Sequence, residues 1–340
     1  MTEPDHSKPL LPDHALPAVE PPSAGFLVQL FVIPFMIVAI LVVGWLFVQW
    51  LVQGSNNPHE FVRGLRGNSE TRWQAAVNLA SALANPQNES ARRDASLARE
   101  LSQILLDNIA TGNMEKQDLL LRDYLCLALG HFNNDAGLPA LLKAATTSRD
   151  PKEDEVRLAA IYGLGESARS MRDSDGKLPA HPEVIEVLIA ASKNDEALLR
   201  GAAALSLGGW GGEPAVERLA QLLDDSQPRA RYAAAAALAR LGDARAIDTI
   251  AEMLSPDAPT ADAPTAKNSI EKSQVAMDDS TLKLPNLLGL KALTQLLEAN
   301  PQADISKLAG PVEQLTKAPN PEVRTHALAV HEALVRKSAR

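Results

Sequence analysis

The sequence predicts an all-α protein, with one membrane-spanning helix followed by an α-solenoid of about seven helical hairpins. Three observations lead to this class. A stretch of 27 residues, 26–52, contains no charged residue. The chain after it holds only seven of the 13 aromatic residues and is rich in Ala and Leu, which favours helices over a β-sheet core. A motif of two helices around a Gly-containing break then recurs along the rest of the chain.

Residues 1–25 are expected to form a disordered, proline-rich acidic tail. Six prolines interrupt any helix in this segment, and no apolar residue recurs at a useful period. Four acidic residues stand against the single basic residue Lys8. The tail therefore lacks the positive n-region that a secretory signal peptide would need.

Residues 26–52 are predicted to form a transmembrane helix. At 1.5 Å per residue the segment is about 40 Å long, more than the ~30 Å hydrocarbon core of a bilayer. Trp45 and Trp50 fit the aromatic belt at the membrane interface. A cleaved signal peptide is the weaker alternative, because the stretch is too long and no small-x-small cleavage site follows it. The expected partner of this segment is the lipid bilayer.

The basic residues beside the predicted span indicate its orientation. Lys8 lies on the N-terminal side, whereas Arg63, Arg66 and Arg72 lie within about 20 residues after the span, the range over which the positive-inside rule operates. We therefore expect a cytoplasmic body and an N-terminal tail on the outer side of the membrane.

Residues 56–338 are predicted to form the repeat body. Its clearest block, PRARYAAAAALARLGDARAIDTIAEML (228–254), reads as an Ala-rich helix, a Leu-Gly-Asp break and a second amphipathic helix. An arginine marks the start of each inner helix, and Leu follows seven residues after the first five. These arginines are Arg72, Arg122, Arg157, Arg200, Arg231 and Arg324. A seventh inner helix over 284–298 carries Asn286 at the arginine position.

Two segments interrupt this pattern. Residues 255–283 include DAPTADAPTA and are expected to be a low-complexity, disordered insertion between the two helices of one unit. Residues 172–177 are a shorter candidate for a disordered loop. Unequal distances between successive anchor positions (the six arginines and Asn286), from 31 to 55 residues, fit repeats that have accepted insertions.

The run VRLAAIYGLG (156–165) and the block at 228–254 resemble the HEAT family, especially the short HEAT-like repeats also found in phycobilin lyases. The resemblance covers roughly residues 56–338 and implies an α-solenoid of stacked hairpins, which bury a continuous core only when neighbours stack. It also implies that the arginines pair with acidic residues or helix-end carbonyls between units. A ligand-binding role for the arginines is the alternative.

The sequence favours a non-enzymatic scaffold that binds an unidentified protein at the cytoplasmic face of the membrane. No P-loop, HExxH or GxSxG motif occurs, and we expect no catalytic residue, cofactor or metal. A formal charge of −9 argues against nucleic-acid binding. A bilin-lyase-like or di-iron hydroxylase-like protein is the alternative, because deoxyhypusine hydroxylase is a HEAT-like enzyme that holds iron with His-Glu pairs. Here such pairs occur only at 59–60 and 331–332, and the oligomeric state is left open.

Overall fold

The computed structural model describes residues 24–52, 58–67, 69–176, 178–259 and 284–338. The chain divides into two compact units, Met1–Asn56 and Asn57–Arg340. Within the described residues all regular structure is helical. Most of the predicted disordered tail (1–25) and of the predicted insertion (255–283) lies outside the described residues, so those two expectations stay predictions.

The first unit contains one long helix, α1 (Ala24–Val52), close to the span predicted over 26–52. It includes Pro34 and has no acidic residue in its first turn and no basic residue in its last. Residues Val28–Trp45 are long and apolar enough to cross a membrane by length and composition. None of the residues in that window is buried by the rest of the chain.

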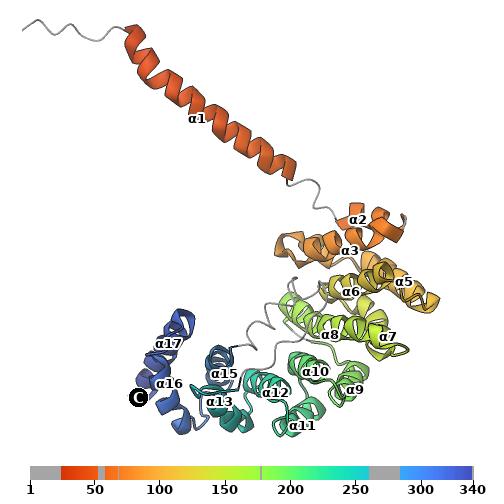
Figure 1. The fold of residues 1–340 in the computed structure, drawn as a ribbon, viewed down its shortest axis with the longest axis vertical. Coiled ribbons are helices and arrows are strands. Elements are labelled where there is room, and N and C mark those ends of the chain that lie inside the picture. The colour runs from red at the N-terminus through yellow and green to blue at the C-terminus, as the bar shows by residue number, and fades with distance from the viewer. Residues whose placement is uncertain (1–23, 53–57, 68, 177, 260–283, 339–340) are drawn as a thin grey trace, which may run out of the picture. The chain divides into compact units, whose positions relative to one another are not determined.

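The second unit is an α-solenoid in which helices pair in chain order (Figure 1). Seven hairpins are formed within the described residues, by α2 with α3, α5 with α6, α7 with α8, α9 with α10, α11 with α12, α13 with α15 and α16 with α17. The number agrees with the seven units predicted. The helices of this unit are α2 (Pro58–Leu65), α3 (Ser69–Ala84), α4 (Glu89–Arg92), α5 (Ala95–Thr111), α6 (Lys116–Gly130), α7 (Leu138–Thr146), α8 (Asp154–Asp175), α9 (Pro182–Ala191), α10 (Ala197–Trp210), α11 (Glu213–Leu222), α12 (Pro228–Arg240), α13 (Ile247–Met253), α15 (Pro285–Ala299), α16 (Ala309–Leu315) and α17 (Pro321–Ser338).

The second helix of each hairpin packs on its counterparts in the neighbouring hairpins and forms an inner layer. The contacts run in order from α3 through α6, α8, α10, α12 and α15 to α17. A single apolar core runs through all seven hairpins. Each hairpin therefore depends on its neighbours to bury its apolar face, as expected for a solenoid.

Small residues let the inner helices approach closely. A Cβ atom added to Gly163 on α8 would lie 2.6 Å from the carbonyl oxygen of Cys126 on α6. A Cβ atom on Gly208 of α10 would lie 2.5 Å from the Cβ of Ala237 on α12. No side chain fits at these two points without a shift of the backbone, so these two glycines set the spacing of the layer there.

Two residues that stood out in the sequence lie in this core. Cys126 is fully buried, and burial raises the pKa of its thiol well above the ordinary value. Trp210 is 8 % exposed, and its indole Nε1 donates a hydrogen bond of 2.9 Å to the carbonyl oxygen of Leu164 in the preceding hairpin. Its ring also meets that of His181 edge-on.

The expectation of a second disordered loop at 172–177 was wrong over most of its length. Helix α8 continues through residue 175 and ends at Gly176, whose φ of 67° closes the helix in the left-handed region. The pattern beyond Met171 looked polar, but Arg172 donates a hydrogen bond of 2.6 Å to the carbonyl oxygen of Gly209 in the next hairpin. That contact ties the polar end of α8 to α10.

Candidate functional site

The apolar surface of α1 is the first candidate site. Large side chains are exposed all along the described part of the helix, for example Phe31 at 65 %, Phe35 at 74 % and Leu41 at 66 %. Trp45 is 60 % exposed, whereas the side chain of Trp50 lies outside the described residues. Water is a poor solvent for such a surface, and by length and composition alone the helix could cross a membrane. The interfacial role of the two tryptophans stays a prediction.

Four of the six marker arginines close the turn of their own hairpin. Each donates a hydrogen bond to a main-chain carbonyl six or seven residues earlier, where the preceding helix has just ended. Carbonyls at a helix C-terminus have no partner within the helix, and a guanidinium fork supplies one. The pairs are Arg72 with Leu65 (2.8 Å), Arg200 with Asn194 (2.9 Å), Arg231 with Asp225 (2.7 Å) and Arg324 with Ala318 (2.8 Å).

Asn286 performs the same task in the hairpin that lacks the arginine. Its side-chain Nδ2 donates to the carbonyl oxygens of Met253 (2.9 Å) and Ser255 (2.8 Å) at the end of α13. The departure from the arginine pattern in the sequence therefore preserves the contact that the position makes.

Two of these arginines also link one repeat to the next. Arg200 on α10 donates from Nε and NH2 to the two carboxylate oxygens of Asp225 at 2.7 and 2.8 Å, in the turn before α12. Arg231 on α12 donates in the same forked way to Glu252 on α13. Burial alone would raise the pKa of Asp225, but the hydrogen bonds from Arg200 and from the backbone N–H of Gln227, together with the charges of Arg200 and Arg231, hold it below its ordinary value. The line Arg200, Asp225, Arg231 and Glu252 thus joins three consecutive hairpins.

The outer helices carry a second, more exposed row of ion pairs. Glu217 on α11 meets Arg245 at 2.9 Å, and Asp248 on α13 meets Lys307 at 2.8 Å. Glu217 and Asp248 occupy the same place in successive repeats, and so do their partners. Both pairs connect adjacent hairpins through water-exposed side chains, where an ion pair contributes little to stability.

Arg122 departs from the other marker arginines because it is completely buried. Nε donates to Asn108 Oδ1 at 2.6 Å, and NH2 donates to the carbonyl oxygens of Asn108 (2.9 Å) and Asn113 (2.6 Å). NH1 has no hydrogen bond but lies 3.6 Å from Oε1 of Glu153. Burial lowers the pKa of the Arg122 guanidinium, and the Glu153 carboxylate opposes that shift.

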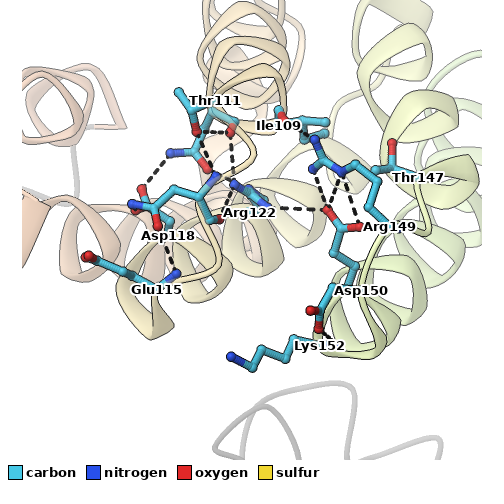
Figure 2. A network of polar contacts seen from close by, with 12 residues as sticks. Ile109, Thr111, Glu115, Asp118, Arg122, Thr147, Arg149, Asp150 and Lys152 are labelled. Carbon is cyan, nitrogen blue, oxygen red and sulfur yellow. Dashed lines mark hydrogen bonds and ion pairs between the residues drawn. The ribbon is translucent and has the colours of Figure 1, made fainter.

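Glu153 lies between two cations from different parts of the fold. Figure 2 shows Arg122 and Arg149 pointing toward one another. Arg149 donates to Glu153 from its backbone N at 2.7 Å and from its guanidinium, and also to the carbonyl oxygen of Ile109 at 3.0 Å. Burial by itself would raise the pKa of Glu153, but the hydrogen bonds from Arg149 hold it below the ordinary value. This cluster joins α5, α6 and the turn before α8.

The carboxyl group of Asp123, unlike that of Glu153, accepts no hydrogen bond from a basic side chain. Its side chain is fully buried on α6, and neither carboxyl oxygen has a hydrogen-bond partner. Burial, reinforced by the nearby Glu155 carboxylate, raises the pKa of Asp123 well above its ordinary value, and Arg122 only partly opposes this. Sequence reasoning missed this residue. Its place directly after the marker arginine in a run of buried positions was the available signal.

Arg157, the remaining marker arginine, contacts a residue that lies closer to it in the chain. Its NH1 donates to Oδ1 of Asp154 one turn earlier on α8 at 2.8 Å, while its buried Nε has no hydrogen-bond partner. All six arginines therefore contact carbonyls or carboxylates of the chain itself. Whether they also bind a ligand is untested.

The two His-Glu pairs lie on different hairpins. His59 and Glu60 belong to α2, where their side chains are not described, and His331 and Glu332 belong to α17. Among the residues that the structure describes, no three His, Cys, Asp or Glu side chains gather in a way that could hold a metal ion. The alternative of a metal-dependent enzyme has no further support here, and the expected lack of a metal stays a prediction.

Comparison with known proteins identifies the repeat type. Residues 185–265 match the family model of HEAT repeats. No curated protein matches the sequence. Among solved structures, an engineered protein is 18 % identical, with 83 % of this chain and 98 % of the other covered and a TM-score of 0.37. A designed armadillo repeat protein is 15 % identical, with coverages of 81 % and 98 % and a TM-score of 0.37.

Human deoxyhypusine hydroxylase in complex with glycerol is a further similar structure. It is 18 % identical, with 81 % of this chain and 96 % of the other covered and a TM-score of 0.29. The repeat type rests on the family match and on the paired helices described above.

Proposed function

Because the chain is a HEAT-like repeat protein with an apolar N-terminal helix, we propose that it is a membrane-anchored scaffold that binds a protein partner at the cytoplasmic face. The observation that carries the proposal is α1, whose side chains from Val28 to Trp45 are uncharged and uncovered by the chain itself. Transfer of such a surface into hydrocarbon is strongly favourable, at roughly 25 cal/mol per Å² of apolar area.

The repeat body supports the scaffold part of the proposal. A solenoid exposes a large surface relative to its length, and its stability comes from contacts between neighbouring hairpins, which leaves that surface free to vary. HEAT-like and armadillo-like repeats fit a role in protein interaction, although the fold alone names no partner. The arginines face the chain's own carbonyls and carboxylates, which supports a structural role for them.

The orientation of the anchor rests on the basic residues after it. Arg63 and Arg66 are exposed beside the first hairpin, and Arg66 pairs with Glu100 on α5. The positive-inside rule counts such residues within about 20 positions of the span. We therefore propose a cytoplasmic repeat body and an outer N-terminal tail.

A charge placed in the middle of α1 tests the anchor. The full chain is expected in the membrane fraction after a carbonate wash, and the variant Val38→Arg combined with Leu41→Arg is expected in the soluble fraction. An arginine near the bilayer centre costs roughly 2.5–3.5 kcal/mol on the insertion scale. The matched control, Arg63→Ala combined with Arg66→Ala, leaves the apolar stretch intact and should stay in the membrane. Full-length wild type in the soluble fraction would disprove the anchor.

Protease protection tests the orientation, and affinity capture tests the scaffold role. In inside-out vesicles the repeat body should be digested and a tag at the N-terminus protected, and the reverse result would disprove the orientation. For the scaffold, proteins crosslinked to the membrane-bound wild type should be reproducible and should be lost when the body is removed. The same captured set with α1 alone would contradict a role for the repeats.

A further inference from the structure

The second helices of the hairpins share a side that faces away from the first helices. Most marker residues contact the turn that precedes their own helix, on the side of the first helix. At 3.6 residues per turn, the positions two before and two, five and nine after the marker lie on the opposite side, which we call the inner face. The positions five after the marker form an apolar row across five successive hairpins: Val77, Leu127, Tyr162, Leu205 and Ala236.

Burial on the inner face is concentrated in the middle of the solenoid. At the position two before the marker, Arg229 on α12 is 5 % exposed, whereas Leu284 at the start of α15 is 36 % exposed. Tyr124 on α6 is buried, whereas Lys291 on α15 and Ala329 on α17 are exposed. An arginine is thus buried where a leucine is exposed, so the type of residue does not explain the difference.

The neighbouring helices do not explain the difference either. Helix α6 packs on α3 and α8 at its sides and on α5 and α7 on the outside, and α12 packs on α10, α15, α11 and α13 in the same way. Helix α15 is flanked likewise by α12, α17 and α13, yet its inner face is exposed. These packed helices leave the inner side of α6 and α12 as open as that of α15, and they do not account for its burial.

We propose that residues 260–283 bind the middle of the inner face and so occupy, within the same chain, the surface that the scaffold offers to a protein partner. The segment follows Pro259, after α13, and ends before Leu284, which itself lies on the inner face. At about 3.3 Å per residue, half of the segment spans roughly 40 Å, and packed helices lie about 10 Å apart. The segment is therefore long enough to reach from α15 to α6 and return.

No other part of the chain outside the described residues is placed to cover this face. The stretches 53–57 and 339–340 and the single positions 68 and 177 are too short. Residues 1–23 precede α1, and in the proposed topology they lie across the bilayer from the repeat body. In this respect the inference rests on the proposed function.

The order of charges along the segment matches the order of charges on the inner face. Asp279 is five residues from Leu284, so it reaches Arg229 on α12, the inner helix next to α15. Lys272 is twelve residues from Leu284, up to about 40 Å, so it reaches Glu155 on α8, three helices away. Acidic residues of the segment therefore meet a basic part of the face, and basic residues meet an acidic part.

The composition of the segment fits a bound part and a connecting part. The low-complexity run DAPTADAPTA ends at residue 266, and the expectation of disorder rests on it. The rest of the segment carries apolar residues at short intervals: Ile270, Val275, Met277 and Leu282. Contact between these side chains and the apolar row removes both from water, which is the main source of binding free energy.

Disulfide trapping within the full-length chain tests the contact, because the native Cys126 is fully buried. Met277→Cys combined with Leu205→Cys on α10 should form an intramolecular disulfide under mild oxidation. The matched control combines Met277→Cys with Ala190→Cys, which is exposed on α9 in the same hairpin. The control should react at least about tenfold more slowly, because the bound segment raises the local concentration of one thiol only. Equal rates would overturn the proposal.

Replacement of residues 260–283 by a Gly-Ser linker of the same length tests the occupancy. A maleimide should label Leu205→Cys about tenfold faster in the replaced chain, with no change at Ala190→Cys, and the proteins crosslinked to the body should increase because the competing segment is gone. Unchanged labelling at position 205 or unchanged capture would overturn the proposal. The membrane fraction is measured alongside, and full-length wild type in the soluble fraction would refute the proposed function while leaving the trapping result in place.

A charge exchange tests the predicted register. Lys272→Glu, in the Met277→Cys and Leu205→Cys background, is expected to slow disulfide formation about two- to fivefold, the effect of one exposed ion pair. Glu155→Lys alone should slow it likewise, and the two changes together restore opposite charges and should restore the rate. A combined variant as slow as the single ones would contradict the contact between Lys272 and Glu155.

Discussion

Six of the seven repeats carry the marker arginine at the same position, yet Arg122 and Arg200 lie in different environments. Arg122 is fully buried, contacts two main-chain carbonyls and shares Glu153 with Arg149. Arg200 keeps 14 % of its side chain exposed and forms a two-pronged ion pair with Asp225. The same residue type in the same register therefore serves two purposes. In the first region it fills the core around α6, and in the second it ties successive hairpins together from their edge.

The largest expected effect is the loss of the buried arginine. Arg122→Ala removes donors from three acceptors and leaves Glu153 buried with one cation fewer, so the free energy of unfolding should fall by about 3–5 kcal/mol. Urea unfolding of the full chain in detergent, followed by circular dichroism, measures it. Arg324→Ala, at the same repeat position but exposed, is the control, with an expected loss below about 1 kcal/mol. Equal losses would erase the contrast between buried and exposed arginines.

The next effect concerns Asp123 beside that arginine. Its pKa is raised in the folded state, so folding favours the protonated form. The stability that this gives is full below the unfolded pKa and is lost as the pH rises through the folded pKa. Asp123→Asn cannot ionise, so its free energy of unfolding should improve relative to wild type as the pH increases from about 4 to 8. Parallel pH profiles for the two proteins would show that the carboxyl is not buried as described.

A double-mutant cycle measures the strength of the ion pair between Arg200 and Asp225. Arg200→Ala, Asp225→Ala and the combined variant should give a coupling energy of about 1–2 kcal/mol near neutral pH. The pKa of Asp225 is lowered in the fold, so this coupling is present above the unfolded pKa and is lost as the pH falls through the folded pKa. Coupling that persisted in strong acid would mean that the carboxylate is not the group that holds Arg200.

The smallest effect belongs to the outer row of ion pairs. Asp248 and Lys307 lie 2.8 Å apart, but their side chains are 81 % and 68 % exposed. The same cycle with Asp248→Ala and Lys307→Ala should give no coupling beyond experimental error, because water screens the pair and both side chains lose freedom in forming it. A coupling energy as large as that of Arg200 with Asp225 would show that solvent exposure does not determine the strength of these ion pairs.

Much of the fold could be predicted because local patterns encode it. The seven-residue spacing from five of the arginines to the next Leu predicted the register of the inner helices, and Gly163 and Gly208 lie where neighbouring inner helices approach closely. Helices α2, α9 and α17 each begin at a proline, a local signal of a helix start. The uncharged run at 26–52 predicted α1 to within two residues at its start.

The polar interior could not be predicted in the same way. Arg122 and Arg149 share Glu153 because α6 and the turn before α8 lie together in the fold, and no spacing along the chain predicts that contact. Asp123 follows the marker arginine as an ordinary acidic residue would, and only the packing of α6 shows that it is enclosed. The polar end of α8 was mistaken for a loop, because its contact with Gly209 depends on the position of the next hairpin.

The side chain of Asn286 donates hydrogen bonds to the carbonyl oxygens of Met253 and Ser255, which precede it by more than thirty residues. The polar segment 260–283 lies between them in the sequence. The contact is therefore made by residues on either side of that segment, and none of its atoms belongs to 260–283. We therefore expect this hairpin to tolerate an insertion between α13 and α15. A fluorescent protein inserted in place of residues 260–283 is expected to leave the packing of the neighbouring hairpins unchanged.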